Sequence, residues 1–346
     1  MESNLELPRT TKRRAVNTPI SNTILNKLTA KVIGQTQALS SIVPYVHMYK
    51  AGLAPEGRPV GVFLLLGPTG TGKTRTVEAL AEVLHGSRKH MVRVDCGEYQ
   101  LDHEVAKLIG APPGYLGHRE THPILTQAKL ASVTSEKSAL SIILFDEIEK
   151  AAPSMTRLLL GVLDKATLRL GDNNVVNFER SLIFLTSNLG AQGMMKVLTP
   201  GFGFAGKAET EEKQSSRLEN IAMAAVRRNF SPEFVNRIDA TLTYQPLSQD
   251  TLTAILGQHI DELQTHIEQR LGSRGFRLTV SEKGRQYLLA EGFSSEYGAR
   301  ELKRVVHKQL TQPLAELVIE GRVKPGGSVR ADYDDKAKAL RLKPAA

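Results

Sequence analysis

The chain has 346 residues, which is enough for a sizeable hydrophobic core and favours two packed units over one. Hydrophobic residues make up 41% of it and charged residues 23%, as is typical of a globular protein, and its single cysteine excludes an internal disulfide or a cysteine-based metal cluster. The net charge of +9 is spread along the chain, and the longest apolar run, Val60 to Leu66, is far below the roughly 18 residues of a membrane span, so neither nucleic acid nor a membrane is favoured as a partner.

The amino-terminal residues are polar and basic. Glu2 and Glu6 precede Lys12-Arg13-Arg14 and no apolar stretch follows, so the segment matches neither a secretory signal nor an acid-poor transit peptide. We therefore expect a flexible arm over residues 1–29 and a cytoplasmic protein.

The next part of the chain, residues 30–246, alternates apolar runs with longer amphipathic stretches. Such alternation is typical of a parallel sheet covered by helices. Residues 191–217 are rich in glycine and polar residues, which predicts a long surface insertion. Cys96 is expected to be buried on a strand. The predicted strands are Val60–Leu66, Met91–Cys96, Ile142–Phe145, Leu182–Thr186 and Thr241–Tyr244.

Residues 247–346 are predicted to form a smaller, mostly helical domain. Pro313 is the single breaker in the last of its helical patterns. The fold class is therefore α/β, a parallel sheet flanked by helices and followed by a small helical domain. The patterns predict helices over Leu252–Leu271, Glu282–Ala290 and Ala299–Glu320 and short strands over Phe276–Val280 and Ser328–Tyr333.

A glycine-rich motif of the form G-x-x-x-x-G-K-T follows the first predicted strand at residues 67–74 and precedes a predicted helix. Its glycines let backbone N–H groups close around phosphate oxygens, Lys73 reaches the outer phosphates, and Thr74 offers a hydroxyl to Mg²⁺. The helix adds the positive charge of its N-terminus. The motif predicts a site for ATP and Mg²⁺ formed by Gly67, Thr69, Gly70, Thr71, Gly72, Lys73 and Thr74.

Four polar residues near the later strands are candidates for the chemistry of ATP hydrolysis. Asp146 and Glu147 end the third predicted strand, where a metal-holding and a water-polarising carboxylate are expected. Asn188 follows the fourth predicted strand and would place its amide beside the γ-phosphate and the attacking water. Arg237 precedes the last strand and would stabilise developing charge. Taken alone, Asn188 is also a common turn residue and Arg237 a common surface ion-pair residue.

Further motifs occur in order along the chain. They are residues 32–35 (VIGQ), 110–117 (GAPPGYLG), 186–190 (TSNLG), 232–239 (PEFVNRID) and 297–300 (YGAR). Together with the two nucleotide motifs, they make the chain resemble the second ATPase module of the Clp-type AAA+ unfoldases ClpA, ClpB and ClpC. The resemblance covers about residues 30 to 330, and it implies an AAA+ fold and a homo-hexameric ring.

The resemblance also implies roles for individual residues. Val32 and Ile33 match the residues that pack on adenine, Asn188 matches the first nucleotide sensor, and Arg300 matches the second sensor on the helical domain. Arg237 matches the arginine finger, which reaches the ATP of the neighbouring subunit in a ring.

Tyr115 and Leu116 match the pore loop that grips polypeptide in the Clp family. The surrounding glycines and prolines present a single aromatic side chain, whose contact area carries little sequence preference. The implied substrate is an unfolded or tagged polypeptide. A tyrosine folded onto its own domain is the alternative. A second pore-facing loop is expected around residues 169–177.

Three features depart from the Clp pattern. Only residues 1–29 stand where relatives carry an N-terminal domain and another ATPase module, which predicts a single-ring motor. Ser231 occupies a position where many relatives have arginine, a difference that affects how the nucleotide state is expected to be signalled between subunits. The third departure is a near match to the aliphatic-Gly-Phe tripeptide that docks on a ClpP-like peptidase, and a loop packed on its own surface is the competing interpretation. The residues of this near match are Pro200, Gly201 and Phe202.

The leading hypothesis is a Mg²⁺-dependent and ATP-dependent protein unfoldase or remodelling chaperone that threads polypeptide through a hexameric pore. One alternative is a nucleic-acid-linked AAA+ motor, which only the basic charge favours. The other is a dedicated complex-assembly ATPase that docks through the basic residues Lys12-Arg13-Arg14.

Overall fold

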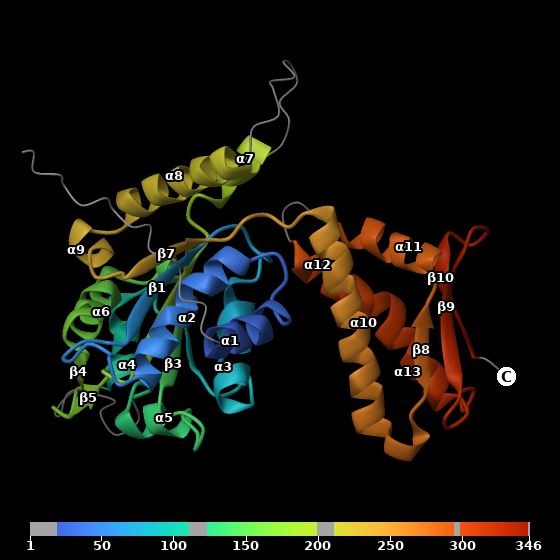
Figure 1. The fold of residues 1–346 in the computed structure, drawn as a ribbon, viewed down its shortest axis with the longest axis horizontal. Helices are drawn as coiled ribbons and strands as arrows, with labels where there is room; N and C mark the ends of the chain where they lie inside the picture. The colour runs from blue at the N-terminus through green and yellow to red at the C-terminus, as the bar shows by residue number, and fades with distance from the viewer. Residues whose placement is uncertain (1–18, 111–122, 199–210, 294–297, 345–346) are drawn as a thin grey trace, which may run out of the picture.

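The computed structural model describes residues 19–110, 123–198, 211–293 and 298–344. Within these ranges the chain forms two units that lie side by side (Figure 1). The first is built around a five-stranded sheet, and the second combines helices with a three-stranded sheet. None of the helices in the described ranges is both long enough and apolar enough to cross a membrane.

The central sheet is formed by β1 (Gly61–Leu66), β2 (Val92–Asp95), β3 (Ser141–Asp146), β6 (Ser181–Ser187) and β7 (Ala240–Thr243). Its strands are all parallel and stand in the order β2-β3-β6-β1-β7. Every residue of β1, β3 and β6 is buried, because strands covered by helices on both faces have no side that meets water. This burial is the reason that these strands stand in the sequence as continuous apolar runs.

All five predicted strands are present, and their ends differ from the predicted ones by at most one residue. Cys96 is buried as expected, but it lies in a 3₁₀ turn, Cys96–Glu98, and not on a strand. The strand ends at Asp95 because its carboxylate accepts a hydrogen bond from the N–H of Gly97, at 2.9 Å, and so caps the turn.

The helices of the sheet domain are α1 (Pro19–Thr29), α2 (Thr36–Lys50), α3 (Lys73–His85), α4 (Ala106–Ile109), α5 (Gln127–Ser132), α6 (Pro153–Lys165), α7 (Ala191–Leu198), α8 (Glu211–Asn229) and α9 (Pro232–Val235). They cover the two faces of the sheet and form a separate core on each. Phe63 and Leu65 of β1 pack with α1, α2 and α3, whereas Val62 and Leu64 pack with α6, α7, α8 and α9. The alternation along one strand shows that both faces are apolar.

Helix α1 lies in the segment for which the sequence predicts a flexible arm. Ile24 is 6% exposed and Leu28 is fully buried, and the helix packs against α2 and α3. Apolar side chains four residues apart share one helix face, so packing on the sheet domain stabilises this helix. The arm prediction is therefore wrong for residues 19–29, and residues 1–18, with Lys12-Arg13-Arg14, lie outside the described residues.

Residues 191–217, predicted as a surface insertion, contain α7 and the first part of α8. Leu218, Ala222 and Val226 of α8 are buried in the core, at the spacing of a single helix face. These three residues lie beyond residue 217, and the part of α8 inside the predicted insertion, EEKQSSR over residues 211–217, is polar, so its sequence carries no apolar stripe. The prediction of a loop is wrong for these two helices. The predicted peptidase-docking residues Pro200, Gly201 and Phe202 lie outside the described residues.

A short antiparallel hairpin of β4 (Thr167–Arg169) and β5 (Val175–Asn177) lies where the second pore-facing loop is expected. The first predicted pore loop, with Tyr115 and Leu116, lies outside the described residues. A pore-facing role for either segment stays a prediction.

The small domain contains α10 (Gln249–Leu271), α11 (Glu282–Gly292), α12 (Ala299–Val306), α13 (Gln312–Ile319), β8 (Arg277–Val280), β9 (Ser328–Asp334) and β10 (Ala339–Pro344). Its strands stand in the order β10-β9-β8, and its core is separate from the two cores of the sheet domain. Helices α10 and α12 lie on the side that faces the sheet domain (Figure 1). The predicted domain boundary near residue 247 falls between β7 and α10.

Two features of the small domain differ from the predicted elements. The helix expected over residues 299–320 is divided by a π-helical turn, His307–Thr311, because Pro313 has no N–H and its ring crowds the turn before it. Strand β10 is absent from the prediction. Its side chains are half-buried or exposed in alternation, so it has no apolar run, and it is held by antiparallel pairing with β9.

Candidate functional site

The glycine-rich loop joins β1 to α3 at the carboxyl edge of the central sheet. Gly67 and Gly72 have φ angles of 143° and 105°, in a backbone region that glycine enters freely. At Gly67, an added β-carbon would lie 2.5 Å from the carbonyl oxygen of Tyr244, so no larger residue fits. The loop leads directly into the N-terminus of α3, the combination that binds phosphate groups.

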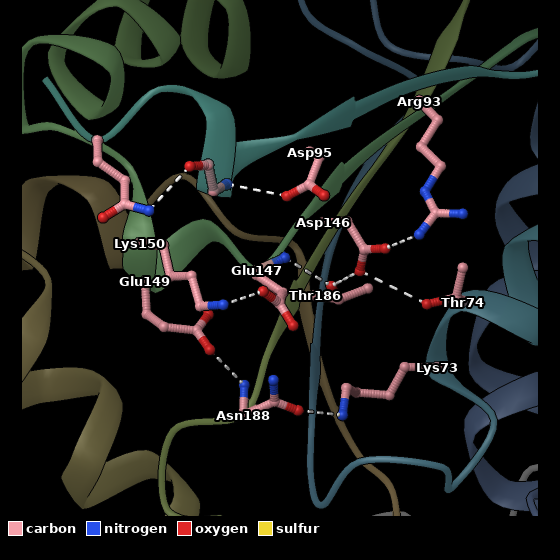
Figure 2. A network of polar contacts seen from close by, with 12 residues as sticks. Lys73, Thr74, Arg93, Asp95, Asp146, Glu147, Glu149, Lys150, Thr186 and Asn188 are labelled. Carbon is pink, nitrogen blue, oxygen red and sulfur yellow. Dashed lines mark hydrogen bonds and ion pairs between the residues drawn. The ribbon is translucent and has the colours of Figure 1, made fainter. Parts of the chain in front are cut away.

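Lys73 is the first residue of α3 and is only 8% exposed. Its ammonium donates to the carbonyl oxygens of Gly67 at 2.6 Å and Pro68 at 2.9 Å, and to Oδ1 of Asn188 at 2.9 Å (Figure 2). Burial lowers the pKa of Lys73 from 10.5 to about 8, although the nearby carboxylates, Glu149 foremost, act in the opposite direction. A buried ammonium held only by neutral oxygens fits an anionic phosphate.

Asp146 ends β3 and is 7% exposed. Its Oδ2 lies 2.5 Å from Nη2 of Arg93 on β2, and its Oδ1 accepts hydrogen bonds from the hydroxyls of Thr186 and, at 3.5 Å, of Thr74 (Figure 2). Across the described residues, no group of three or more His, Cys, Asp or Glu side chains is gathered to hold a metal. The pair of Asp146 and Thr74 fits Mg²⁺, which keeps several waters and takes phosphate oxygens as ligands.

Glu147 follows Asp146 with a left-handed backbone, φ 57° and ψ 50°. Its N–H donates to Oγ1 of Thr186 at 3.0 Å, and its carboxylate pairs with Lys150 at 2.5 Å (Figure 2). The left-handed conformation is uncommon for a residue with a side chain and costs free energy. Glu147 thus lies at the point where the regular strand ends and the turn Ile148–Lys150 begins.

Asn188 connects the end of β6 to the glycine-rich loop. Its side-chain oxygen accepts from Lys73, and its N–H donates to Oε1 of Glu149 at 2.9 Å. The other oxygen of Glu149 is inaccessible to water and has no hydrogen-bond partner among the described residues. Glu149 therefore fixes the backbone of Asn188, although the sequence pattern does not single it out.

A cleft of about 320 Å³ between the two domains brings these residues together. That volume lies in the range of small-molecule sites, roughly 300–1,000 Å³. The small domain closes one side, and the N–H of Ala299 at the start of α12 donates to the carbonyl oxygen of Gly70 at 3.2 Å. The predicted residues that line the cleft are Val32, Ile33, Thr69, Gly70, Thr71, Gly72, Lys73, Thr74, Asp146, Glu147, Asn188 and Arg300.

Comparison with protein families identifies the family of the chain that forms this cleft. Residues 58–241 match the sequence model of the family described as AAA domain (Cdc48 subfamily). The chain belongs to the AAA family. Residues 247–331 match the family described as the C-terminal, D2-small domain of ClpB protein, so the chain is a Clp-type AAA+ module and an ATPase. The predicted resemblance and fold class are confirmed.

Three curated relatives align with most of this AAA+ module. The ATP-dependent Clp protease ATP-binding subunit ClpC of Staphylococcus epidermidis is 37% identical over 93% of this chain and 38% of its own length. The chaperone protein ClpB of Enterococcus faecalis is 37% identical over 91% of this chain and 34% of its own length. That of Corynebacterium diphtheriae is 38% identical over 89% and 32%. The chain thus spans about a third of the length of the curated relatives it matches.

Arg237 does not line the cleft of its own AAA+ module. Its guanidinium lies 3.0 Å from the carboxylate of Glu233 and 3.5 Å from that of Asp164, and its side chain is 22% exposed. Ser231 caps α9 by accepting the N–H of Phe234 at 3.2 Å. A role for Arg237 at the site of a neighbouring subunit stays a prediction.

The cleft of the AAA+ module also contains charged residues that the sequence motifs miss. Arg93 comes from β2, Arg75 from α3, and His259 and Glu262 from α10. The carboxylate of Glu262 lies 3.4 Å from Arg75. A hydrogen bond with His259 and the charge of Arg75 lower the pKa of Glu262 to about 2. No linear motif marks these residues, because the contacts between them join distant segments.

Proposed function

We propose that this chain is the ATP-hydrolysing unit of a protein unfoldase or remodelling chaperone. In this proposal it forms a homo-hexameric ring in the cytoplasm and draws an unfolded or tagged polypeptide through the pore. The observation that carries the proposal is the cleft in which the glycine-rich loop, Asp146, Glu147, Asn188 and Arg300 face one space. The names of the relatives, a subunit of a protease and two chaperones, support a protein substrate.

Nucleotide binding uses residues from both sides of the cleft. Val32 and Ile33 would pack on the adenine ring, and the N–H groups of the glycine-rich loop would hold the phosphates. Lys73 would exchange its neutral partners for phosphate oxygens. Their negative charge would favour the protonated form of Lys73, which burial disfavours. Thr74 would hold Mg²⁺ directly and Asp146 through water. Mg²⁺, when bound, would neutralise negative charge on the phosphates.

Hydrolysis would depend on Glu147 as the group that polarises the attacking water and on Asn188 as the group that orients it. The carboxylate of Glu147 is paired with Lys150. A general base must reach the water by a hydrogen bond, so the contact with Lys150 has to open before Glu147 acts on water. Arg300 would sense the phosphates from the small domain, whose helix α12 already contacts Gly70.

Arg237 is proposed to stabilise the ATP of the neighbouring subunit, because it lies outside the cleft of its own chain. We expect Arg237→Ala to lose hydrolysis. Mixing it with Glu147→Gln subunits should restore activity, because an intact Arg237 then meets an intact site across an interface. If no mixing ratio recovers hydrolysis, Arg237 does not act in trans.

Substrate handling is proposed for two segments. Tyr115 and Leu116 would grip the polypeptide, and Tyr115→Ala should retain ATP hydrolysis but lose the unfolding of a tagged fluorescent protein. Full unfolding by Tyr115→Ala would contradict threading. The segment Pro200, Gly201 and Phe202 would dock on a ClpP-like peptidase, and Phe202→Ala should then abolish co-elution with that peptidase while leaving unfolding intact.

The direct test of the ATPase assignment is Glu147→Gln, which should bind ATP as the unchanged protein does but hydrolyse it at least about 100-fold more slowly. The matched control is Glu98→Gln, an exposed carboxylate after the neighbouring strand β2, which should hydrolyse normally. Normal turnover by Glu147→Gln would refute the role of Glu147. The same variant should retain its client in the ring, and recovery of nucleic acid instead of polypeptide would replace the unfoldase with a nucleic-acid motor.

A further inference from the structure

Arg93 forms an ion pair with Asp146, the carboxylate that would hold the divalent cation. It lies on β2 in register with Leu144 of β3 and reaches across to Asp146 at the end of that strand (Figure 2). The distance from its Nη2 to Oδ2 of Asp146 is 2.5 Å. The other oxygen of Asp146 accepts the hydroxyls of Thr186 and Thr74. Arg93 thus takes one of the two acceptor positions of Oδ2 and the two hydroxyls take those of Oδ1, so a metal-bound water would have to share Oδ2 with Arg93 or replace it.

The exposure of the two partners decides which one can leave the pair. The side chain of Asp146 is 10% exposed, whereas that of Arg93 is 45% exposed. A buried carboxylate needs a positive partner, because an unpaired charge in the interior is costly. A half-exposed guanidinium can exchange the same contact for water at small cost. A cation that enters the cleft would consequently displace Arg93 and leave Asp146 in place.

We propose that Arg93 competes with the divalent cation for Asp146 and is displaced from Asp146 when Mg-nucleotide enters the cleft. This inference rests on the proposed use of Mg²⁺ and ATP. Arg93 is then a positioning residue: it keeps Asp146 neutralised and aligned, and it makes the metal compete with a side chain of the protein. The competition keeps the affinity for Mg²⁺ low until phosphates add their charge.

A static brace would give the opposite effects on metal binding. If Arg93 only kept Asp146 in the correct position, removing it would weaken the binding of Mg²⁺. If Arg93 competes with the metal, removing it strengthens the binding of Mg²⁺. Removal should also weaken nucleotide binding in the absence of metal, because a bare Asp146 carboxylate would face the phosphates. The two effects of opposite sign distinguish competition from structural support.

The experiment measures binding rather than hydrolysis. A fluorescent ATP analogue is titrated into the full chain in EDTA, and Mg²⁺ is then titrated into the complex, for the unchanged protein and for Arg93→Ala, Arg93→Lys and Arg88→Ala. We expect Arg93→Ala to lower the Mg²⁺ midpoint by about twofold to fivefold, the size of one partly exposed ion pair, and to weaken metal-free binding. Arg93→Lys, which retains a charge but not the planar guanidinium, should show a smaller shift.

Arg88→Ala is the matched control, because Arg88 lines the same cleft, whereas the guanidinium that pairs with Asp146 in the described part of the chain is that of Arg93. It should leave the Mg²⁺ midpoint unchanged even if it alters nucleotide affinity. An unchanged or raised midpoint in Arg93→Ala, or an equal shift in Arg88→Ala, overturns the inference. If Arg93→Ala does not fold, Arg93→Lys provides the test: a lowered Mg²⁺ midpoint supports the inference, and an unchanged or raised midpoint overturns it. If hydrolysis of ATP by the unchanged protein does not depend on Mg²⁺, the proposed Mg-ATP chemistry itself fails instead.

Discussion

The buried ammonium of Lys73 predicts that ATP binding weakens above neutral pH. Its pKa is lowered to about 8, chiefly by burial. Bound phosphates favour the charged form, so nucleotide binding takes up a proton wherever free Lys73 has lost one. Affinity should therefore be constant below the pKa and fall as pH rises through it.

The magnitude follows from the fraction of Lys73 that is protonated. A group with a pKa of about 8 is roughly 90% protonated at pH 7 and roughly 10% protonated at pH 9. The dissociation constant for ATP should thus rise about ninefold between these two values. For comparison, a lysine that kept the ordinary pKa of 10.5 would produce almost no change over the same interval.

The assay is isothermal titration of the Glu147→Gln protein with ATP between pH 7 and pH 9.5, so that hydrolysis does not interfere. Lys73→Met is the control, because a variant that cannot titrate at this position should bind weakly at every pH without the same slope. The heat measured in two buffers of different ionisation enthalpy gives the proton uptake directly. A pH-independent dissociation constant, or an equal slope in Lys73→Met, would refute the reasoning.

The same pKa shift has an opposite effect on the stability of the nucleotide-free chain. Between pH 8 and pH 10.5 the unfolded chain keeps a proton on Lys73 that the folded chain has released. The unfolded state binds more protons in this window, so the contribution of Lys73 to the free energy of unfolding rises with pH, by about 3 kcal/mol in all. The free energy of unfolding in urea is measured for the unchanged protein and for Lys73→Met at each pH, and the difference between them isolates this contribution. If the unchanged protein loses stability relative to Lys73→Met as the pH rises, the sign is wrong.

Three further variants test the packing around the site. Leu28→Ala should lower the free energy of unfolding by about 2–5 kcal/mol, since Leu28 is fully buried in the sheet domain, and a change near zero in urea would show that α1 does not belong to it. Gly298→Ala should weaken ATP binding measured by calorimetry, since Gly298 has a φ of 51° and a β-carbon would lie 3.0 Å from the oxygen of Gly70; undiminished affinity would contradict that contact. Tyr244→Phe should cost about 1 kcal/mol of unfolding free energy, because it removes the buried hydrogen bond to Thr76 at 2.8 Å, and equal stability would rule out that contribution.

The sequence by itself determined the nucleotide chemistry of this protein, because that chemistry depends on short-range rules. The spacing of glycines in residues 67–74 specifies a loop that only glycine can form, and polar residues directly after apolar strands specify one edge of a parallel sheet. Asp146 and Asn188 consequently converge on the loop, as expected, and both line the cleft. These inferences do not require the order of the strands.

Only the tertiary structure decided which partners those residues have. Arg93 meets Asp146 because β2 stands beside β3, and Lys73 meets Asn188 because β6 stands beside β1. Helix α10 brings Glu262 to the cleft, where it meets Arg75. The two residues are 187 positions apart in the sequence. A side chain's charge, exposure and pKa follow from neighbours that are distant in the sequence, so the competition proposed at Asp146 becomes visible only in the folded chain.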